Sequence, residues 1–397
     1  MTAFDLSAGA AKRALAPTGA FDEGDAAARE RYATAVWCQL IEPGDSVAGR
    51  LIAGRGAAPA LEAVLGEGTL PDVTSRELAE ARKRWLPRLS ARAVADSLAV
   101  AAARGVTLVT RSDPQWPGQL DDLDAHAPVC LWVRGDVAAL RRLDASVAIV
   151  GARAASRYGD HVAMELSAEL AGGGVAVVSG GAYGIDGAAH RAALSAGGLT
   201  VALLAGGADR SYPVGHTRLI DDIAERGVVV SEVACGSAPT KWRFLQRNRL
   251  IAALSTATVV VEAGWRSGSL NTAGHAAALS RPLGAVPGPI TSATSAGTHR
   301  LIREYGAQCI TGADDVRELL GLGSGKDPHA GVQTGYTGES TRVMDAMSTR
   351  AWRDSADIGR RAGMAADAVD GVLGLLRLDG SVEAGADGWR LTRRAGG

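Results

Sequence analysis

Short apolar runs alternate with longer amphipathic segments between residue 147 and about residue 310. Continuous apolar runs of about four or five residues are typical of strands buried on both faces, and the amphipathic segments between them are typical of helices. This alternation predicts parallel β-α-β units, and hence a Rossmann-like, doubly wound, mostly parallel sheet of the α/β class. The expected strands are Val147–Val150, Val175–Val178, Thr200–Leu204, Val228–Ser231, Thr258–Val261, Leu283–Val286 and Gln308–Ile310. The expected helices include Asp160–Ala171, Ile185–Ser195, Thr217–Ala224 and Gly268–Leu279.

Different patterns precede this core. Residues 1–28 are rich in Ala, Gly and Asp without periodicity, and we expect a mobile tail there. Residues 29–105 carry apolar positions at helical spacing and predict a small helical (SAM-like) domain. Its Pro43-Gly44 turn could belong to a helix-hairpin-helix that holds a DNA phosphate, but a plain interhelical turn is favoured because one Pro-Gly turn is a weak signal. The short strands Val106–Val109 and Val129–Val133 then open the Rossmann-like domain, expected over residues 106–320.

The C-terminal part has a third pattern. Gly- and Ser-rich residues 321–338 predict a linker, and residues 339–397 predict a winged helix. Helices at Asp357–Gly363 and Asp367–Leu378 precede a strand-turn-strand pattern that ends at Leu391. The second helix would enter a major groove, yet it carries Asp367 and Asp370 and no Lys or Arg before Arg377. Because carboxylates repel phosphates, we predict that it does not read duplex DNA and has a protein-contact or structural role instead.

Composition restricts the class of protein. Apolar residues make up 47% and charged residues 21%, as in ordinary globular proteins, and the formal net charge is −1. A surface that binds nucleic acid therefore has to be locally basic. We find no secretory signal and no apolar stretch near the roughly 20 residues of a membrane span, so we expect a cytoplasmic protein without a membrane partner. The cysteines are scattered without metal-ligand spacing and are expected to be reduced structural thiols; they are Cys38, Cys130, Cys235 and Cys309.

Three glycine-rich turns follow predicted strands, and each opens a helix. In an open parallel sheet ligands bind beyond the carboxyl ends of the strands, where free amides and the helix dipole favour an anion. The first turn starts at Gly151, which permits a sharp bend, and offers the guanidinium of Arg153, the hydroxyl of Ser156 and the ring of Tyr158. Asp160 is expected to cap the helix that follows. The simpler alternative is a turn whose arginine makes a surface salt bridge.

The second turn contains Gly180, Gly181 and Gly184, which permit positive φ and close approach of a ligand. It matches neither the dinucleotide fingerprint nor the P-loop, and no acidic residue ends the next strand to hold a ribose. Asp186 and His190 lie one helical turn apart and could form a catalytic pair. A structural role for both is favoured, because no nucleophile or third partner lies near them.

The third turn, at residues 262–273, places Ser267 and Ser269 beside the start of a helix, after a strand that ends in Glu262. The segment before it, residues 241–251, is the densest cationic stretch of the core, with Trp242 and Phe244 interleaved. Cations that hold a backbone and aromatic rings that stack on bases are typical of grooves for single-stranded nucleic acid. A solvated basic helix face is the alternative.

Five motifs in this order resemble the DNA-processing protein A (DprA/Smf) family. They are GARAASRYG, SGGAYGIDGAAH, a Gly206-Gly207 turn with Tyr212-Pro213, RNRLIAALS, and VVVEAGWRSGSLNTAGHA followed by Val286-Pro287-Gly288. The resemblance implies a protein without catalytic residues, cofactor or metal. It implies a protein that binds and protects single-stranded DNA, forms a homodimer through the Rossmann-like domain and helps to load the recombinase RecA in natural transformation.

The turns and the resemblance together predict one set of DNA-binding residues. They are Gly151, Arg153, Ser156, Tyr158, Gly180, Gly181, Lys241, Arg243, Arg247, Asn248, Arg249, Ser267 and Ser269. The chain departs from the family where Phe244-Leu245-Gln246 precedes the RNR motif and where Asn271 replaces an apolar residue. The competing hypothesis is an enzyme similar to nucleoside-monophosphate phosphoribohydrolases, with Glu262 as the catalyst; a nucleotide-sensing module is a weaker third. The signature of those enzymes is missing, because Glu262 precedes the Gly-Ser turn instead of following it.

Overall fold

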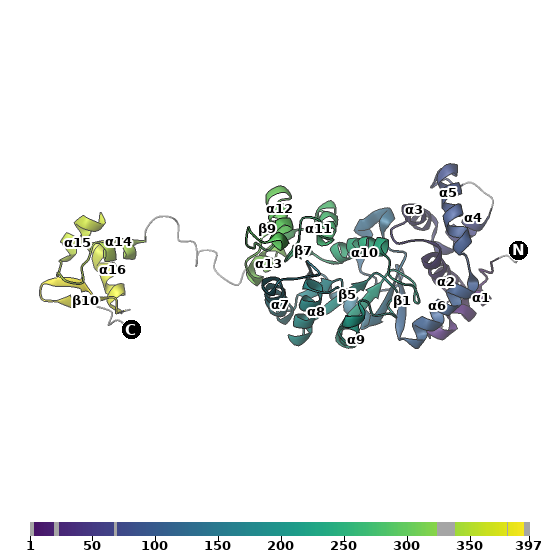
Figure 1. The fold of residues 1–397 in the computed structure, drawn as a ribbon, viewed down its shortest axis with the longest axis horizontal. Coiled ribbons are helices and arrows are strands. Elements are labelled where there is room, and N and C mark those ends of the chain that lie inside the picture. Colours follow the sequence, from purple (N-terminus) through teal and green to yellow (C-terminus); the bar gives the residue numbers. More distant parts are fainter. Residues whose placement is uncertain (1–3, 20–23, 67–69, 324–337, 379, 393–397) are drawn as a thin grey trace. The chain divides into compact units, whose positions relative to one another are not determined.

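A nine-stranded sheet forms the centre of the fold, with the strand order β1-β2-β6-β5-β4-β3-β7-β8-β9 (Figure 1). The computed structural model describes residues 4–19, 24–66, 70–323, 338–378 and 380–392, and the chain divides into two units, Met1–Ser324 and Gly325–Gly397. The seven strands from β6 to β9 in this order run parallel, while β1 and β2 are antiparallel at one edge. The strands are β1 (Val106–Thr110), β2 (Cys130–Gly135), β3 (Ser146–Val150), β4 (Ala176–Ser179), β5 (Thr200–Leu204), β6 (Val228–Ser231), β7 (Ala257–Val260), β8 (Leu283–Ala285) and β9 (Gln308–Cys309).

The predicted fold class is confirmed, and every strand expected between residues 147 and 310 lies within one residue of an observed one. Alternate strand residues face opposite helical layers. Val147 and Ile149 of β3 pack against one layer, and Ala148 and Val150 pack against the other. The first layer contains α7 (Arg157–Gly172), α8 (Ile185–Ser195), α9 (Thr217–Arg226) and α13 (Ala313–Leu319). The second contains α10 (Lys241–Leu254), α11 (Ser269–Ala278) and α12 (Ala296–Glu304).

The strand order reverses between β3 and β7. From β3 the chain adds β4, β5 and β6 on one side, and from β7 it adds β8 and β9 on the other. The loops that leave β3 and β7 therefore diverge, and this opens a crevice at the carboxyl ends of these two strands.

Helices at the N-terminus cover the antiparallel edge of the sheet. They are α1 (Ala8–Leu15), α2 (Asp25–Leu40), α3 (Ser46–Arg55), α4 (Ala57–Leu65), α5 (Ser75–Trp85) and α6 (Ala91–Ala103). Their core also includes Leu108 of β1 and Trp132 of β2, so the region expected as a separate domain at 29–105 is part of the first unit. The predicted mobile tail is wrong for the described residues, because α1 buries Ala11 and Leu15 against α2 and α6.

The Pro43-Gly44 turn is a plain interhelical turn between α2 and α3. Asp45 caps α3 by accepting hydrogen bonds from the amides of Val47 and Ala48. Gly44 has a φ of +78° and packs so closely on α10 that a Cβ there would lie 2.6 Å from Oε1 of Gln246. The turn therefore fixes the helical region to α10.

The second unit has its own core around Val343, Ile358 and Leu373. It consists of α14 (Glu339–Asp345), α15 (Ser355–Ala362), α16 (Ala366–Leu378) and a hairpin of β10 (Val382–Gly385) and β11 (Gly388–Leu391). The predicted helices and hairpin are present, and the winged-helix class stays a prediction. Most of the linker predicted at 321–338 lies outside the described residues.

Two expectations about the whole chain can be compared with the described residues. No helix among them is long and apolar enough to cross a membrane. Cys38, Cys130 and Cys235 are buried, with the sulfurs of Cys38 and Cys130 2.6 Å apart, whereas Cys309 is exposed.

Candidate nucleic-acid interface

A cavity of about 480 Å³ lies at the β3/β7 crevice. The loop after β3 lines it with Gly151–Ala154, the loop after β7 lines it with Gly264–Ser269, and α10 contributes Phe244, Arg247 and Asn248. These elements are the first turn, the third turn and the cationic segment singled out in the sequence. Of the predicted residues, the cavity brings together Gly151, Arg153, Arg247, Asn248, Ser267 and Ser269.

The first turn is shaped by its glycine and by a buried carboxylate. A Cβ at Gly151 would lie 2.5 Å from Ile185, so no larger residue fits there. Ser156, and not Asp160, caps α7, because its hydroxyl accepts the amide of Gly159 at 3.1 Å. The same hydroxyl donates to Glu262 at 2.6 Å. Ser156 therefore uses its hydroxyl to hold the turn and lies outside the cavity lining, and its predicted contact with DNA stays a prediction.

Glu262 joins three loops and is buried. It accepts hydrogen bonds from the amide of Ser156 at 2.9 Å, from its hydroxyl, and from the hydroxyl of Thr294 at 3.0 Å. Glu262 is not one of the described residues that line the cavity. A carboxylate held by three donors away from the cavity positions the loops and is not placed to act on a ligand there.

The second turn forms a rigid wall behind the cavity. A Cβ at Gly180 would lie 2.5 Å from the guanidinium of Arg247, and Gly181 has a φ of +66°. Asp186 accepts the amide of Ala182 at 3.3 Å, and burial raises its pKa although Arg247 opposes the shift. Gly180 and Gly181 thus shape the wall, while Ala182 and Asp186 reach the cavity itself.

Asp186 and His190 do not form a catalytic pair. Nδ1 of His190 lies 2.7 Å from the hydroxyl of Thr200, and burial lowers the histidine pKa to about 3. The imidazole is therefore neutral at physiological pH and belongs to the core. The structural role favoured from the sequence is the one observed.

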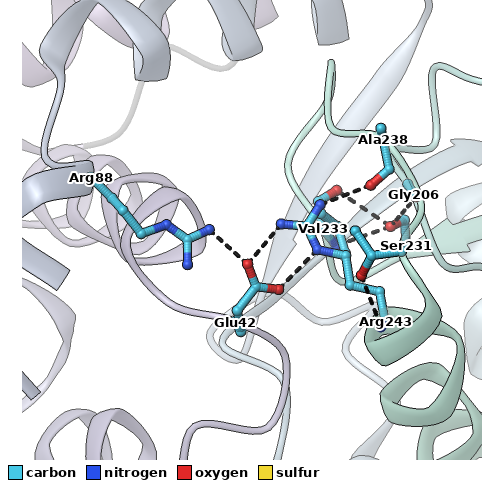
Figure 2. A network of polar contacts seen from close by, with 8 residues as sticks. Glu42, Arg88, Gly206, Ser231, Val233, Ala238 and Arg243 are labelled. Atoms are coloured by element: carbon cyan, nitrogen blue, oxygen red, sulfur yellow. Dashed lines mark hydrogen bonds and ion pairs between the residues drawn. The ribbon is translucent and has the colours of Figure 1, made fainter. Parts of the chain in front are cut away.

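Two arginines predicted to face DNA are instead paired with carboxylates. Arg249 is buried and donates to Glu232 at 2.6 Å. Arg243 donates from Nε and Nη2 to Glu42, each at 2.9 Å, and from Nη1 to the carbonyl of Ala238 (Figure 2). Neither side chain lines the cavity, because Glu232 and the distant Glu42 hold them, and their contact with DNA stays a prediction.

Arg247 keeps a place in the cavity. It donates to the carbonyls of Gly180 and Leu203, at 2.7 and 2.5 Å, and burial lowers its pKa to about 10. It stays protonated at neutral pH and supplies a fixed positive charge at the back of the cavity. Lys241, in the first turn of α10, is exposed and lies outside the cavity lining.

Phe244 is the centre of an aromatic and cationic cluster. The guanidinium carbons of Arg153 and Arg247 lie 4.9 and 5.7 Å from its ring centroid, and the Tyr212 ring lies 5.6 Å away. Cations at this distance from an aromatic face attract its π electrons. Neither Phe244 nor the exposed Arg266, which also lines the cavity, was in the predicted set. Phe244 was recognised in the sequence as an aromatic of the cationic segment, although it was left out of that set.

The third turn presents hydroxyls and an amide. Oγ of Ser267 lies 2.8 Å from Oγ of Ser269, and both line the cavity. Asn248 donates to Oδ1 of Asn271 at 3.2 Å, so the unusual Asn271 pairs with a residue of the RNR motif. Tyr158 lies outside the cavity lining: its hydroxyl donates to the carbonyl of Pro287 at 2.7 Å, and its ring is exposed.

The cavity thus offers three arginines, two serine hydroxyls and an aromatic ring, and Asp186 is its acidic member. No group of His, Cys, Asp or Glu that could hold a metal ion occurs within the described part of the chain. This arrangement can bind an anionic chain and stack a planar base.

Known proteins resemble this chain in sequence and in fold. The family model of DNA recombination-mediator protein A matches residues 107–321. A DNA processing protein DprA of Mycobacterium tuberculosis is 44% identical over 317 residues, which cover 76% of this chain and 81% of that protein. The crystal structure of DNA processing protein A from Streptococcus pneumoniae has a TM-score of 0.59 and 32% identity, covering 72% of this chain and 97% of that one. The protein of the same name from Helicobacter pylori, described for its single-stranded DNA binding mode, has a TM-score of 0.49 and 32% identity, covering 54% and 96%.

Proposed function

The chain belongs to the DNA recombination-mediator protein A (DprA/Smf) family, and on that premise we propose that it binds single-stranded DNA in the β3/β7 cavity. The observation that carries the proposal is that the guanidinium carbons of Arg153 and Arg247 lie 4.9 and 5.7 Å from the centre of the Phe244 ring in one cavity. An aromatic ring close to cations can stack a base while the cations hold neighbouring phosphates.

Each cavity residue then has a defined task. The exposed Arg153 offers a planar fork of donors to a phosphate, and Arg247 supplies a charge that its carbonyl partners keep in place. Ser267 and Ser269 donate to phosphate or sugar oxygens. These contacts do not depend on base identity, so little sequence preference is expected.

The family resemblance supports the cellular part of the proposal. The protein protects incoming single strands in the cytoplasm, forms a homodimer through the Rossmann-like domain and helps RecA to assemble on the strand during natural transformation. It acts as a binding protein and not as an enzyme. RecA filament assembly on single-stranded DNA, followed by fluorescence with and without the protein, tests the loading step, and an unchanged assembly rate would contradict it.

Fluorescence anisotropy with single- and double-stranded oligonucleotides tests the binding site. Arg153→Ala should weaken single-strand binding and lower the slope of log K against log salt by about 0.7, the value of one phosphate contact. Arg142→Ala is the control, because Arg142 is also exposed but precedes β3 at the opposite, amino edge of the sheet. Equal affinity for both DNA forms, or equal effects of the two variants, would contradict the site.

A further inference from the structure

Two arginines share the carboxylate of Glu42, which lies in the turn between α2 and α3. Arg243 of α10 donates to both oxygens at 2.9 Å, and Arg88 donates to Oε1 at 2.9 Å (Figure 2). Arg88 ends the short 3₁₀ helix η2 (Leu86–Arg88), which follows α5. One carboxylate thus joins the helical region to the first turn of α10, with an arginine on each side.

This trio carries a net charge of +1 that faces solvent. Burial alone would raise the pKa of Glu42, but the hydrogen bonds and charges of Arg243 and Arg88 hold it below the ordinary value, so the carboxylate is ionised. The side chains of Arg88 and Glu42 are 36% and 38% exposed, while that of Arg243 is 12% exposed. The hydrogen bond to Glu42 is the polar contact of Arg88 within the described residues. Arg243 alone is enough to attach Glu42 to α10. Arg88 adds a second cation, which is partly exposed.

Further cationic and apolar side chains continue this surface. Arg84 pairs with Asp45 at 3.3 Å, and its side chain is 61% exposed. The Asp45 carboxylate is buried and also accepts a hydrogen bond from the indole N–H of Trp85. At the start of α10, Lys241 is exposed and Trp242 is 54% exposed. We call the set Arg84, Arg88, Lys241, Trp242 and Arg243 the α10–η2 strip.

The strip is continuous with the cavity. Trp242 lies three residues before Leu245, which lines the cavity, so the two share a face of α10. Glu42 then connects Arg243, in the same turn of α10, to Arg88. A strand that leaves the cavity beside Leu245 meets the exposed indole of Trp242, and the half-buried guanidinium of Arg88 and the exposed one of Arg84 follow. A neutral or acidic surface would not extend the path of an anionic chain in this way.

We infer that the α10–η2 strip is a second binding segment for single-stranded DNA, in which Arg88 and Arg84 contact backbone phosphates and Trp242 stacks a base. The inference rests on the proposed function, because it extends the path that begins in the β3/β7 cavity. It assigns a DNA-binding role to the helical region, which contributes no side chain to the cavity. A strand that occupies only the cavity does not reach Arg88.

A length series of oligothymidylates, from about 4 to about 20 nucleotides, separates the two segments by anisotropy. Arg88→Ala should leave the shortest strand bound as in the wild type, and should weaken the longest about 3- to 10-fold with a salt slope lower by about 0.7. Arg88→Lys keeps the charge and should recover most of the lost affinity. Arg50→Ala is the matched control, because Arg50 pairs with Glu77 at 2.7 Å and has a similar exposure of 39%, while Glu77 binds no second arginine in the part of the chain that the structure describes.

The outcomes are distinguishable. If the wild type binds no strand of any length, the proposed function itself fails. If Arg153→Ala weakens every length while Arg88→Ala changes none, or changes all lengths equally, the cavity stands and the second segment is overturned. Thermal melting of each variant accompanies the titration, and an Arg88→Lys variant that melts like the wild type but binds long strands no better than Arg88→Ala also overturns it.

Discussion

The guanidinium carbon of Arg153 lies 4.9 Å from the centre of the Phe244 ring, although the two residues belong to different β-α-β units. Arg153 follows β3, and Phe244 lies in the helix that leads into β7. The reversal of strand order between β3 and β7 is what places them at one crevice. The ring and the cation are thus held by the sheet and not by a flexible loop alone.

Replacing the ring removes the stacking platform. Phe244→Ala should lower the affinity for single-stranded DNA by about 1–3 kcal/mol, the cost of losing one stacked base. Phe244→Trp should retain most of the affinity. Anisotropy measures both, with Leu378→Ala as a control, since that leucine is 87% exposed on the second unit. Similar losses in the alanine and tryptophan variants would show that stacking is not the interaction.

Gly180 should tolerate no side chain. Gly180→Ala places a Cβ 2.5 Å from Arg247, which is buried and cannot move away freely, and about 1–3 kcal/mol of stability should be lost. Gly172→Ala is the matched control, because the last residue of α7 has open space around it, and it should be neutral or slightly stabilising. Urea denaturation compares the two, and equal midpoints would contradict the packing described for the second turn.

Glu262 should be needed for stability and not for chemistry. Glu262→Ala leaves the amide of Ser156 and the hydroxyl of Thr294 without their buried acceptor, which should cost about 3 kcal/mol. Incubation of the wild type with nucleoside monophosphates should release no base. Released base that disappears in a folded Glu262→Gln variant would support the phosphoribohydrolase hypothesis instead.

Acid should weaken the attachment of the helical region to α10. The pKa of Glu42 is lower in the folded state than in the unfolded state. The free energy of unfolding contributed by its arginine pairs is therefore fully present above about pH 4.5 and is lost as the pH falls through the pKa of the folded state. Because the pairs are half-exposed, the contribution is about 1 kcal/mol. Urea denaturation from neutral pH to about pH 3 should show the stability difference between wild type and Glu42→Gln shrinking toward zero. A difference that stays constant with pH would contradict this assignment.

The second unit should not add duplex DNA binding. Asp367 lies in the first turn of α16 and Asp370 follows in the next, and both are exposed. The chain shortened after residue 323 should therefore bind duplex DNA as weakly as the full chain. Asp367→Lys with Asp370→Lys should raise duplex affinity if only these charges prevent groove contact. A loss of duplex binding on shortening would overturn the prediction.

The strands were predictable because parallel strands that are buried on both faces consist of unbroken apolar runs, as at Val228–Ser231. Helix α1 was not, since its Ala- and Gly-rich sequence becomes helical by packing Ala11 and Leu15 against partners that only the fold supplies. The same limit applies to the cationic segment of α10. Its sequence shows four arginines and lysines, but the partner of Arg243 lies 201 residues away, so no local pattern separates the charges that are neutralised from those that are free.

The core shared by the N-terminal helices and the sheet edge restricts how this architecture can change in evolution. Loss of residues 1–105 would uncover Trp132 and Leu108 and would also leave Arg243 without its carboxylate, so a chain without these helices needs a more polar sheet edge and another partner for Arg243. The second unit has a core of its own, so its loss or replacement is not expected to unfold the first unit. Changes at Trp132 and Leu108 are therefore expected to accompany changes in the helices that cover them.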